Sequence, residues 1–293
     1  MKAMCSENKK HEASLSFKID VGPLQSLANC YKNPGHSAFI DAGSFTVADL
    51  PVGVQKSAVA DALFQLIESL ISLTVRVAVS TTSPGRPSFF KNTSTPYPFH
   101  DKRGSYEKRL GTGRIQDVEM FTADDRRPCK CPACRKNSTP ALEWGTLYVT
   151  TARHVVFDQH EAQLSVCRLF FDAPESNGTD VRGEDLRIVD EKVDKCLVLC
   201  ISHDTSLLQK LSDTLQTYRR MDKKVQKISK KNKASNRTCV IVSHPHGCSK
   251  HITFGRWTHS PDGREGGSCF YHTSATCPGS SGAPVYILGS RIG

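Results

Sequence analysis

The stretch TCPGSSGAPVY, residues 276–286, is a tight turn followed by a short apolar run. A glycine such as Gly279 lets the backbone approach closely and adopt dihedrals that other residues avoid, so the N–H groups of the turn can point toward one spot. Taken alone, a Gly-Ser-Ser-Gly turn is more often structural than catalytic. If it is catalytic, it predicts Ser281 as a nucleophile, Ser280 as a supporting turn residue, and the amides of Gly279 and Ser281 as an oxyanion hole.

A serine hydroxyl is a weak nucleophile, so it needs a base, and the base needs an orienting group. Of the 11 histidines, His154 in VTTARHVVF stands at the end of an apolar run beside small residues. Asp194 in VDKCLVLCIS precedes another apolar run, and Asp204 in HDTSLLQKL is the alternative orienting carboxylate. We favour Asp194 because the run that follows it is more continuous. The predicted set is therefore His154, Asp194 and Ser281, in that order along the chain.

These motifs resemble those of trypsin-like serine proteases. TARHVV is similar to their Thr-Ala-Ala-His motif, GSSGAP to Gly-Asp-Ser-Gly-Gly-Pro, and DKCLVL to the Asp that precedes an apolar strand. The continuation His-Val-Val and the stretches VIVSHPHG and YHTSATCPGSSGAPV are closer to the HtrA and glutamyl-endopeptidase branches than to secreted trypsins. The resemblance covers roughly residues 73–293. It implies a mainly β fold, a chymotrypsin-like double antiparallel β-barrel, and peptide-bond hydrolysis without a cofactor.

The periodicity of the chain agrees with many short strands separated by turns. Residues 57–72 have apolar side chains at helical spacing, which predicts a helix before the first strand. We expect residues 1–44 to be poorly ordered or a small appendage and residues 45–293 to form the protease domain, with a basic helical insertion over 205–237. The strands are expected within the segments 73–82, 110–121, 143–157, 195–202, 238–247, 251–257, 267–274 and 283–293.

The sequence also departs from the trypsin pattern. Ser280 stands where trypsins have the Asp that pairs with a newly freed N-terminus, which argues against that kind of zymogen activation. The chain ends at Gly293, where the resemblance implies one more strand beside the substrate, so the domain looks truncated. An alternative function is therefore an inactive protease-like module that holds a partner in its cleft or on its basic helix. Ala275, six residues before Ser281, occupies the base of the implied specificity pocket.

The chain contains 12 cysteines and has no apolar N-terminal segment of the kind that directs secretion. Reduced thiols or metal ligands are therefore expected rather than a disulfide framework, and the protein is expected inside the cell, in the cytoplasm or the nucleus. The motif PCKCPAC makes Cys129, Cys131 and Cys134 weak candidates for a zinc site, because no fourth ligand stands beside them. The alternative is an exposed loop. His244 and His246 in SHPHG are expected in a hairpin turn rather than on a metal.

The 293 residues carry a formal net charge of +10, with a cluster of Lys and Arg within 205–237. Leucines at roughly helical spacing make this segment amphipathic, and its basic face could contact nucleic acid weakly. A solvated helix inserted between two strands is the simpler interpretation. The expected partner is a protein or peptide substrate, and no apolar stretch is long enough to predict a membrane span.

Overall fold

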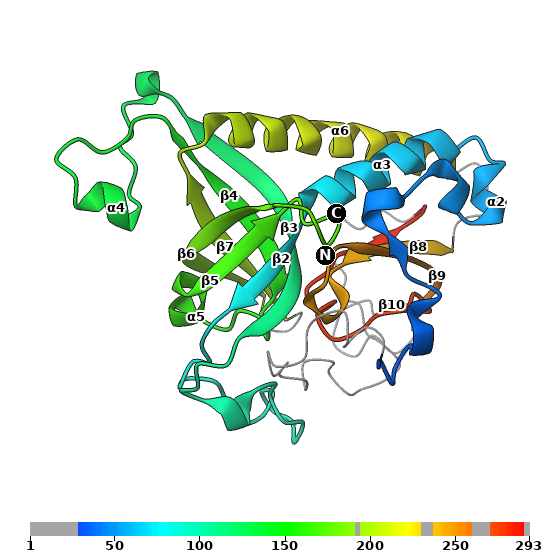
Figure 1. Cartoon of the computed structure of the whole chain (residues 1–293), viewed down its shortest axis with the longest axis horizontal. Coiled ribbons are helices and arrows are strands. Elements are labelled where there is room, and N and C mark those ends of the chain that lie inside the picture. Colours follow the sequence, from blue (N-terminus) through cyan, green and yellow to red (C-terminus); the bar gives the residue numbers. More distant parts are fainter. Residues whose placement is uncertain (1–28, 191–193, 230–236, 260–269, 290–293) are drawn as a thin grey trace.

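The computed structural model describes residues 29–190, 194–229, 237–259 and 270–289. These residues form a closed β-barrel, a second sheet beside it, and two long helices, one of which runs across both halves while the other lies mainly over the second sheet (Figure 1). The fold is thus mixed, with more helix than the sequence predicted.

The barrel consists of six antiparallel strands in the order β2-β3-β4-β7-β6-β5. Alternate side chains of each strand point inward, as Val75, Val77 and Val79 do from β2, and all three are fully buried. Two of the six strands, β5 and β6, were not predicted from the sequence. The strands are β2 (Thr74–Val79), β3 (Arg109–Phe121), β4 (Trp144–Ala152), β5 (Ser165–Leu169), β6 (Thr179–Asp190) and β7 (Lys195–Ser202).

The second sheet is open among the described residues. Its order is β1-β9-β8-β11, with β10 paired to β9. The strands are β1 (Ile40–Asp41), β8 (Thr238–Ser243), β9 (His251–His259), β10 (Phe270–His272) and β11 (Val285–Ile287). One closed barrel and one open sheet therefore replace the two closed barrels implied by the resemblance.

Part of the segment 1–44 is built into this second sheet. Residues 1–28 lie outside the described part of the chain. Ile40 of β1 pairs with Ile252 of β9, and the amide of Ala42 donates to the carbonyl of Lys250 at 3.0 Å. The part of this segment that contains β1 is thus hydrogen-bonded to the second sheet, and the division of the chain at residue 44 stays a prediction.

Helix α3 (Ala60–Leu73) fills the helix predicted over 57–72, and α6 (Thr205–Ser229) fills most of the basic insertion; residues 230–236 are not described. Helix α6 buries leucines such as Leu208 and Leu211 in the barrel core, and it buries Met221 and Val225 in the core of the second sheet. It therefore ties the two halves together. The short helices are α2 (Val52–Gln55), α4 (Pro132–Arg135), α5 (Gln159–Gln163), η2 (Pro34–His36), η3 (Ala42–Ser44), η4 (Val47–Asp49), η5 (His100–Lys102), η6 (Ala123–Asp125) and η8 (Pro245–Gly247).

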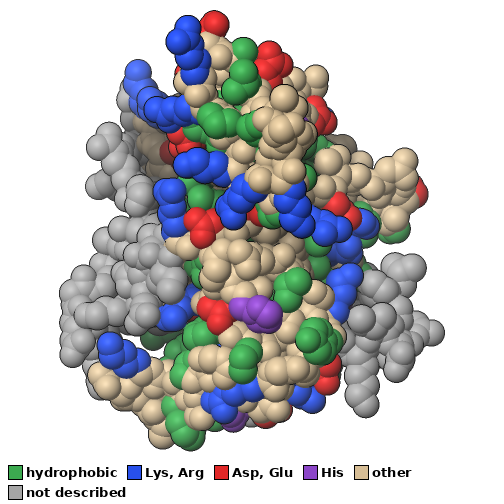
Figure 2. Space-filling view, turned by 90° about the vertical axis from the view of Figure 1, so that its left-hand side faces the viewer, with side chains coloured by type: hydrophobic (Ala, Val, Ile, Leu, Met, Phe, Trp, Pro, Cys, Tyr) green, Lys and Arg blue, Asp and Glu red, His purple; other side chains and the backbone are tan. Residues whose placement is uncertain are grey.

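The basic side chains of α6 face solvent. Exposed positions are Arg219, Arg220, Lys223, Lys224 and Lys227, and Arg219 pairs with Asp117 of β3 at 2.9 Å. On the barrel face shown in Figure 2, Lys and Arg side chains are interspersed with Asp and Glu. Contact of α6 with nucleic acid stays a prediction.

No helix within the described ranges combines the length and apolar composition that crossing a bilayer requires.

Candidate active site

His154 and Asp194 meet because strands β4 and β7 pair along their whole length. Ala152 at the end of β4 lies opposite Lys195 at the start of β7, so the residues just beyond both strand ends lie together. Asp194 has a φ of +51°, in the left-handed region that Asp tolerates better than most residues. This conformation aims its carboxylate at the turn that follows β4.

The Asp194 carboxylate contacts His154 at two points. Its Oδ1 accepts a hydrogen bond from the His154 backbone N–H at 2.9 Å, and its Oδ2 contacts the ring Nδ1. The Asp194 carbonyl also accepts from the amide of Arg153 at 2.9 Å. His154 is 7% exposed, so ring position and ring tautomer are both constrained at a largely buried site.

Asp204 lies beyond the other end of β7. Its Oδ1 accepts from the Leu207 amide at 2.9 Å, as an N-cap does at the start of α6. The structure therefore brings Asp194 onto His154 and gives Asp204 a structural role in the helix.

The turn that carries Ser281 is fastened to β3 by Thr112. The Thr112 amide donates to the Ser281 carbonyl at 2.8 Å, and the Thr112 hydroxyl donates to the Gly279 carbonyl at 2.7 Å. The same hydroxyl accepts from the amide of His244 at 3.0 Å. A buried threonine that nothing in the sequence singled out thus holds the candidate nucleophile turn to the strand next to β4.

The two glycines of the turn are required by close backbone approach. Gly279 has a φ of +94°, and a Cβ there would lie 2.4 Å from the His244 carbonyl oxygen. Gly282 has a φ of +87°, and a Cβ there would lie 2.2 Å from the Thr112 carbonyl oxygen and 2.9 Å from the Ala152 amide. Ala152 is two residues before His154, so the serine turn lies against the end of β4.

Ser280 supports the turn from inside. It is 5% exposed, its Oγ lies 3.0 Å from the Ser243 hydroxyl, and its amide donates to the Cys277 carbonyl at 2.9 Å. Ser281, by contrast, is half-buried. The turn therefore presents Ser281 rather than Ser280.

A buried ionic cluster lies beneath the His154 turn. Glu161 accepts bidentate hydrogen bonds from Arg86 at 2.8 and 2.6 Å and pairs with Arg109 at 2.8 Å. Arg86 also donates to the carbonyl of His154 at 3.0 Å. Burial lowers the pKa of Arg109 to about 10, against the opposing effect of Glu161, so the Arg109 guanidinium stays charged at neutral pH. Arg86 of the cluster thus holds the His154 carbonyl, while Asp194 holds the His154 backbone N–H.

We expect Glu161→Gln to destabilise the protein by about 3–5 kcal/mol, because it leaves two buried guanidiniums without a carboxylate. Denaturant unfolding followed by circular dichroism measures this. Asp180→Asn is the matched control, since Asp180 pairs with Arg168 near the surface and should change stability by about 1 kcal/mol or less. Equal effects of the two variants would contradict the structural role assigned to the cluster.

The buried thiol of Cys196, two residues after Asp194, does not compete as a nucleophile. Its Sγ lies 3.4 Å from the Val156 carbonyl oxygen, and burial raises its pKa well above its usual range. A thiol held protonated in this way is inert.

The weak zinc candidates acquire a fourth partner in the structure. Cys129, Cys131 and Cys134 are buried in the loop between β3 and β4, and the His203 Nε2 lies 3.1, 3.9 and 3.6 Å from their sulfur atoms. His203 follows β7, so its proximity depends on strand pairing and not on sequence spacing. These four ligand atoms could hold a metal ion, and three Cys with one His is a usual ligand set of closed zinc sites.

His244 and His246 flank Pro245 in the turn between β8 and β9, where η8 forms. His244 is fully buried, and its Nδ1 lies 2.8 Å from the Cys248 carbonyl oxygen. Burial lowers the pKa of His244 well below its usual range, so its ring is neutral. His246 lies in the same turn, as expected from the sequence, and its ring is also one of four groups that could hold a metal ion.

Comparison with known proteins identifies the kind of domain. Residues 141–289, just over half of the chain, match the family described as "Trypsin-like peptidase domain". No curated protein matches the chain.

Solved structures similar to this chain include HtrA-type proteases. One is the HtrA-type protease AlgW with a tripeptide, at 11% identity and a TM-score of 0.39 over 77% of this chain and 50% of that one. Another is a serine endoprotease from Yersinia pestis, at 11% identity and a TM-score of 0.34 over 77% and 53%. The chain thus spans about half the length of these structures.

Proposed function

The chain belongs to the family of trypsin-like peptidase domains, and on this premise we propose that it is a serine endopeptidase. The proposed catalytic residues are His154, Asp194 and Ser281. The observation that carries the proposal is the double contact of the Asp194 carboxylate with the His154 backbone and ring, at the strand end against which the Ser281 turn packs.

In the proposed reaction, Ser281 Oγ attacks the carbonyl carbon of the scissile bond while His154 Nε2 takes its proton. His154 then returns that proton to the leaving amine, and an acyl-enzyme remains on Ser281. Water attacks the acyl-enzyme, with His154 again as base, and the carboxylic acid product is released. Asp194 keeps the proton of the neutral ring on Nδ1, which leaves the base role to Nε2, and it stabilises the imidazolium.

The oxyanion that forms on attack needs aligned donors. The turn's own hydrogen bonds use the amides of Ser280 and Ala283, which donate to the carbonyls of Cys277 and Ser280. We assign the oxyanion hole to the amides of Gly279 and Ser281. The left-handed backbone at Gly279 supports this assignment.

Cleavage of a mixed peptide library, with products identified by mass spectrometry, tests the proposal. Purified protein should cleave internal bonds, and the Ser281→Ala variant prepared in the same way should not. Absence of cleavage by both would favour the alternative, a protease-like module that binds a partner without hydrolysing it.

The same library tests specificity. Ala275 supplies no carboxylate to attract a Lys or Arg side chain. His272, on β10, has its pKa lowered mainly by burial, so its ring is neutral above its usual pKa and offers no positive charge to an acidic side chain. We therefore expect uncharged residues of modest size before the cleaved bond at neutral pH. A dominant preference for Arg or Lys there would refute this interpretation of the pocket.

We further propose that the protein works in the cytoplasm or the nucleus. None of the ten described cysteines forms a disulfide, which is usual in a reducing compartment.

A further inference from the structure

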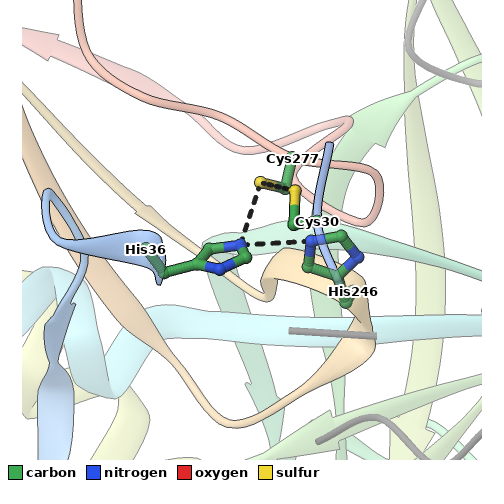
Figure 3. Close-up of side chains that lie close together, drawn as sticks. All are labelled: Cys30, His36, His246 and Cys277. Carbon is green, nitrogen blue, oxygen red and sulfur yellow. Dashed lines mark hydrogen bonds between the residues drawn. The ribbon is translucent and has the colours of Figure 1, made fainter. Parts of the chain in front are cut away.

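Four side chains from three distant parts of the chain converge beside the serine turn. Cys30 and His36 come from the N-terminal segment, His246 comes from η8 between β8 and β9, and Cys277 comes from the loop that leads into Ser281. Figure 3 shows the two rings and the two sulfur atoms pointing toward one another.

Three of the six separations between the ligand atoms are close to those of a tetrahedral site. The two sulfur atoms lie 3.6 Å apart, the Cys277 sulfur lies 3.3 Å from the His36 Nε2, and the two Nε2 atoms lie 3.2 Å apart. All four atoms lie within 4.8 Å of one another. Around a zinc ion with Zn–S bonds of ~2.3 Å and Zn–N bonds of ~2.0 Å, tetrahedral ligand atoms are about 3.3–3.8 Å apart.

The sulfur separation is also too long for a disulfide, in which the S–S bond is ~2.05 Å. Both sulfur atoms also accept hydrogen bonds from a neighbouring residue. Asn33 donates from its side-chain amide to the Cys277 sulfur at 3.1 Å and from its backbone N–H to the Cys30 sulfur at 3.4 Å. Such outer hydrogen bonds orient metal ligands and stabilise their charge.

Burial makes a metal the natural partner of these groups. Cys277 is fully buried, and Cys30 and His246 are each 6% exposed. Two thiolates and one Zn²⁺ form a neutral unit, which removes the cost of burying separate charges. Two sulfur and two nitrogen ligands in a tetrahedron favour zinc over harder cations.

We propose that Cys30, His36, His246 and Cys277 bind a structural zinc ion that ties the N-terminal segment to the loop preceding Ser281. Four protein ligands close the coordination sphere, so the metal has no open position for substrate or water. Cys277 and Ser280 are hydrogen-bonded to each other through their backbones, which connects the metal directly to the turn. The zinc ion would thus stabilise the serine turn by holding the loop before it to the N-terminal segment.

Zinc content measures the site without reference to activity. The full chain, purified in reductant with zinc and freed of unbound metal, is compared with Cys30→Ser and with His36→Ala by elemental mass spectrometry. Each variant should hold one zinc fewer per chain than the unaltered protein. Cys167→Ser, in the barrel core, is the matched control and should lose none. Zinc content in Cys30→Ser equal to that of the unaltered protein would overturn the site.

A second measurement needs no variant, in case these fail to fold. Alkylation of the unaltered protein, mapped by peptide mass spectrometry, should leave Cys30 and Cys277 protected until a zinc chelator is added. Cys167 should stay protected throughout. Alkylation of Cys30 and Cys277 that does not respond to the chelator, or recovery of a Cys30–Cys277 disulfide from the reduced preparation, would contradict zinc binding.

The expected effect on catalysis rests on the proposed function, whereas zinc content does not. If both hold, Cys30→Ser should reduce the rate of Ser281 acylation while His154 and Asp194 remain in contact. Loss of zinc with an unchanged acylation rate would contradict the proposal that the zinc ion stabilises the serine turn. Zinc binding by a chain whose Ser281 is never acylated would show that the proposed peptidase function is wrong and the zinc site is not.

Discussion

Ser281→Ala is expected to lower peptide-bond turnover by about 10⁶-fold and to leave the fold unchanged. The substitution removes the attacking oxygen, but the hydrogen bond from the Thr112 amide to the backbone carbonyl of residue 281 remains. Because residues of a triad act as a unit, His154→Ala should lose a similar factor. The double variant should lose little more than either single one. Steady-state kcat on a cleaved peptide measures all three.

Ser280→Ala is the matched control for this series. Ser280 is buried and bonded to Ser243, so its loss should reduce stability by about 1–3 kcal/mol while turnover falls far less than in Ser281→Ala. Two results would show that Ser281 is not the nucleophile. One is turnover that survives in purified Ser281→Ala, and the other is turnover that disappears in a folded Ser280→Ala.

Asp194→Asn is expected to lower kcat by about 10⁴-fold, as replacement of the triad Asp by Asn does in the serine-protease template. The amide that replaces the carboxylate cannot hold the proton on His154 Nδ1 or stabilise the imidazolium. The variant should fold normally, since an Asn side chain can still accept from the His154 backbone N–H and also tolerates the left-handed backbone at this position.

Asp204→Asn should be mild in the same assay. Asn is as good an N-cap as Asp, and Asp204 contacts the start of α6 and not the turn after β4. A larger loss of kcat in Asp204→Asn than in Asp194→Asn would move the orienting role to Asp204.

The sequence predicted elements whose periodicity was strong. Helix α3 and the alternating strand β2 follow from their apolar spacing alone, and α6 follows from its leucine stripe. Strands β5 and β6 were missed for a physical reason. Strand β6 carries Asp180, Arg182 and Arg187 and has Gly183 at its middle, so little of it is apolar. It is a strand because β5 and β7 pair with it on either side.

The candidate site likewise contains residues that the sequence predicts and residues that it does not. The proposed catalytic residues His154, Asp194 and Ser281 were predicted from the sequence because each has a local motif around it. The residues that position them carry no local signal. In the sequence, Glu161 looks like an ordinary acidic residue of a helix. Only the structure shows that Arg86 and Arg109 both bind its carboxylate. In the sequence, Thr112 is one of many threonines in predicted strands. Only the structure shows its hydrogen bond to the turn that carries Ser281.

The two groups of possible metal ligands show most clearly what spacing in the sequence cannot predict. His203 joins Cys129 because β7 ends beside the β3–β4 loop, and Cys30 joins Cys277 across nearly the whole length of the chain. Ligand sets of this kind come from tertiary folding, so spacing in the sequence cannot reveal them. The contribution of residues 29–44 carries no sequence signal for the same reason, since it consists of a two-residue strand and two of the proposed metal ligands.

Labelling with a fluorophosphonate shows whether Ser281 is an activated nucleophile, because this reagent reacts with an activated serine and requires no knowledge of the substrate. The labelled protein is digested, and the modified residue is located by tandem mass spectrometry. We predict a single adduct on Ser281 that is abolished in His154→Ala and retained in Ser280→Ala. No adduct on the folded protein, or an adduct on a serine other than Ser281, would contradict the account.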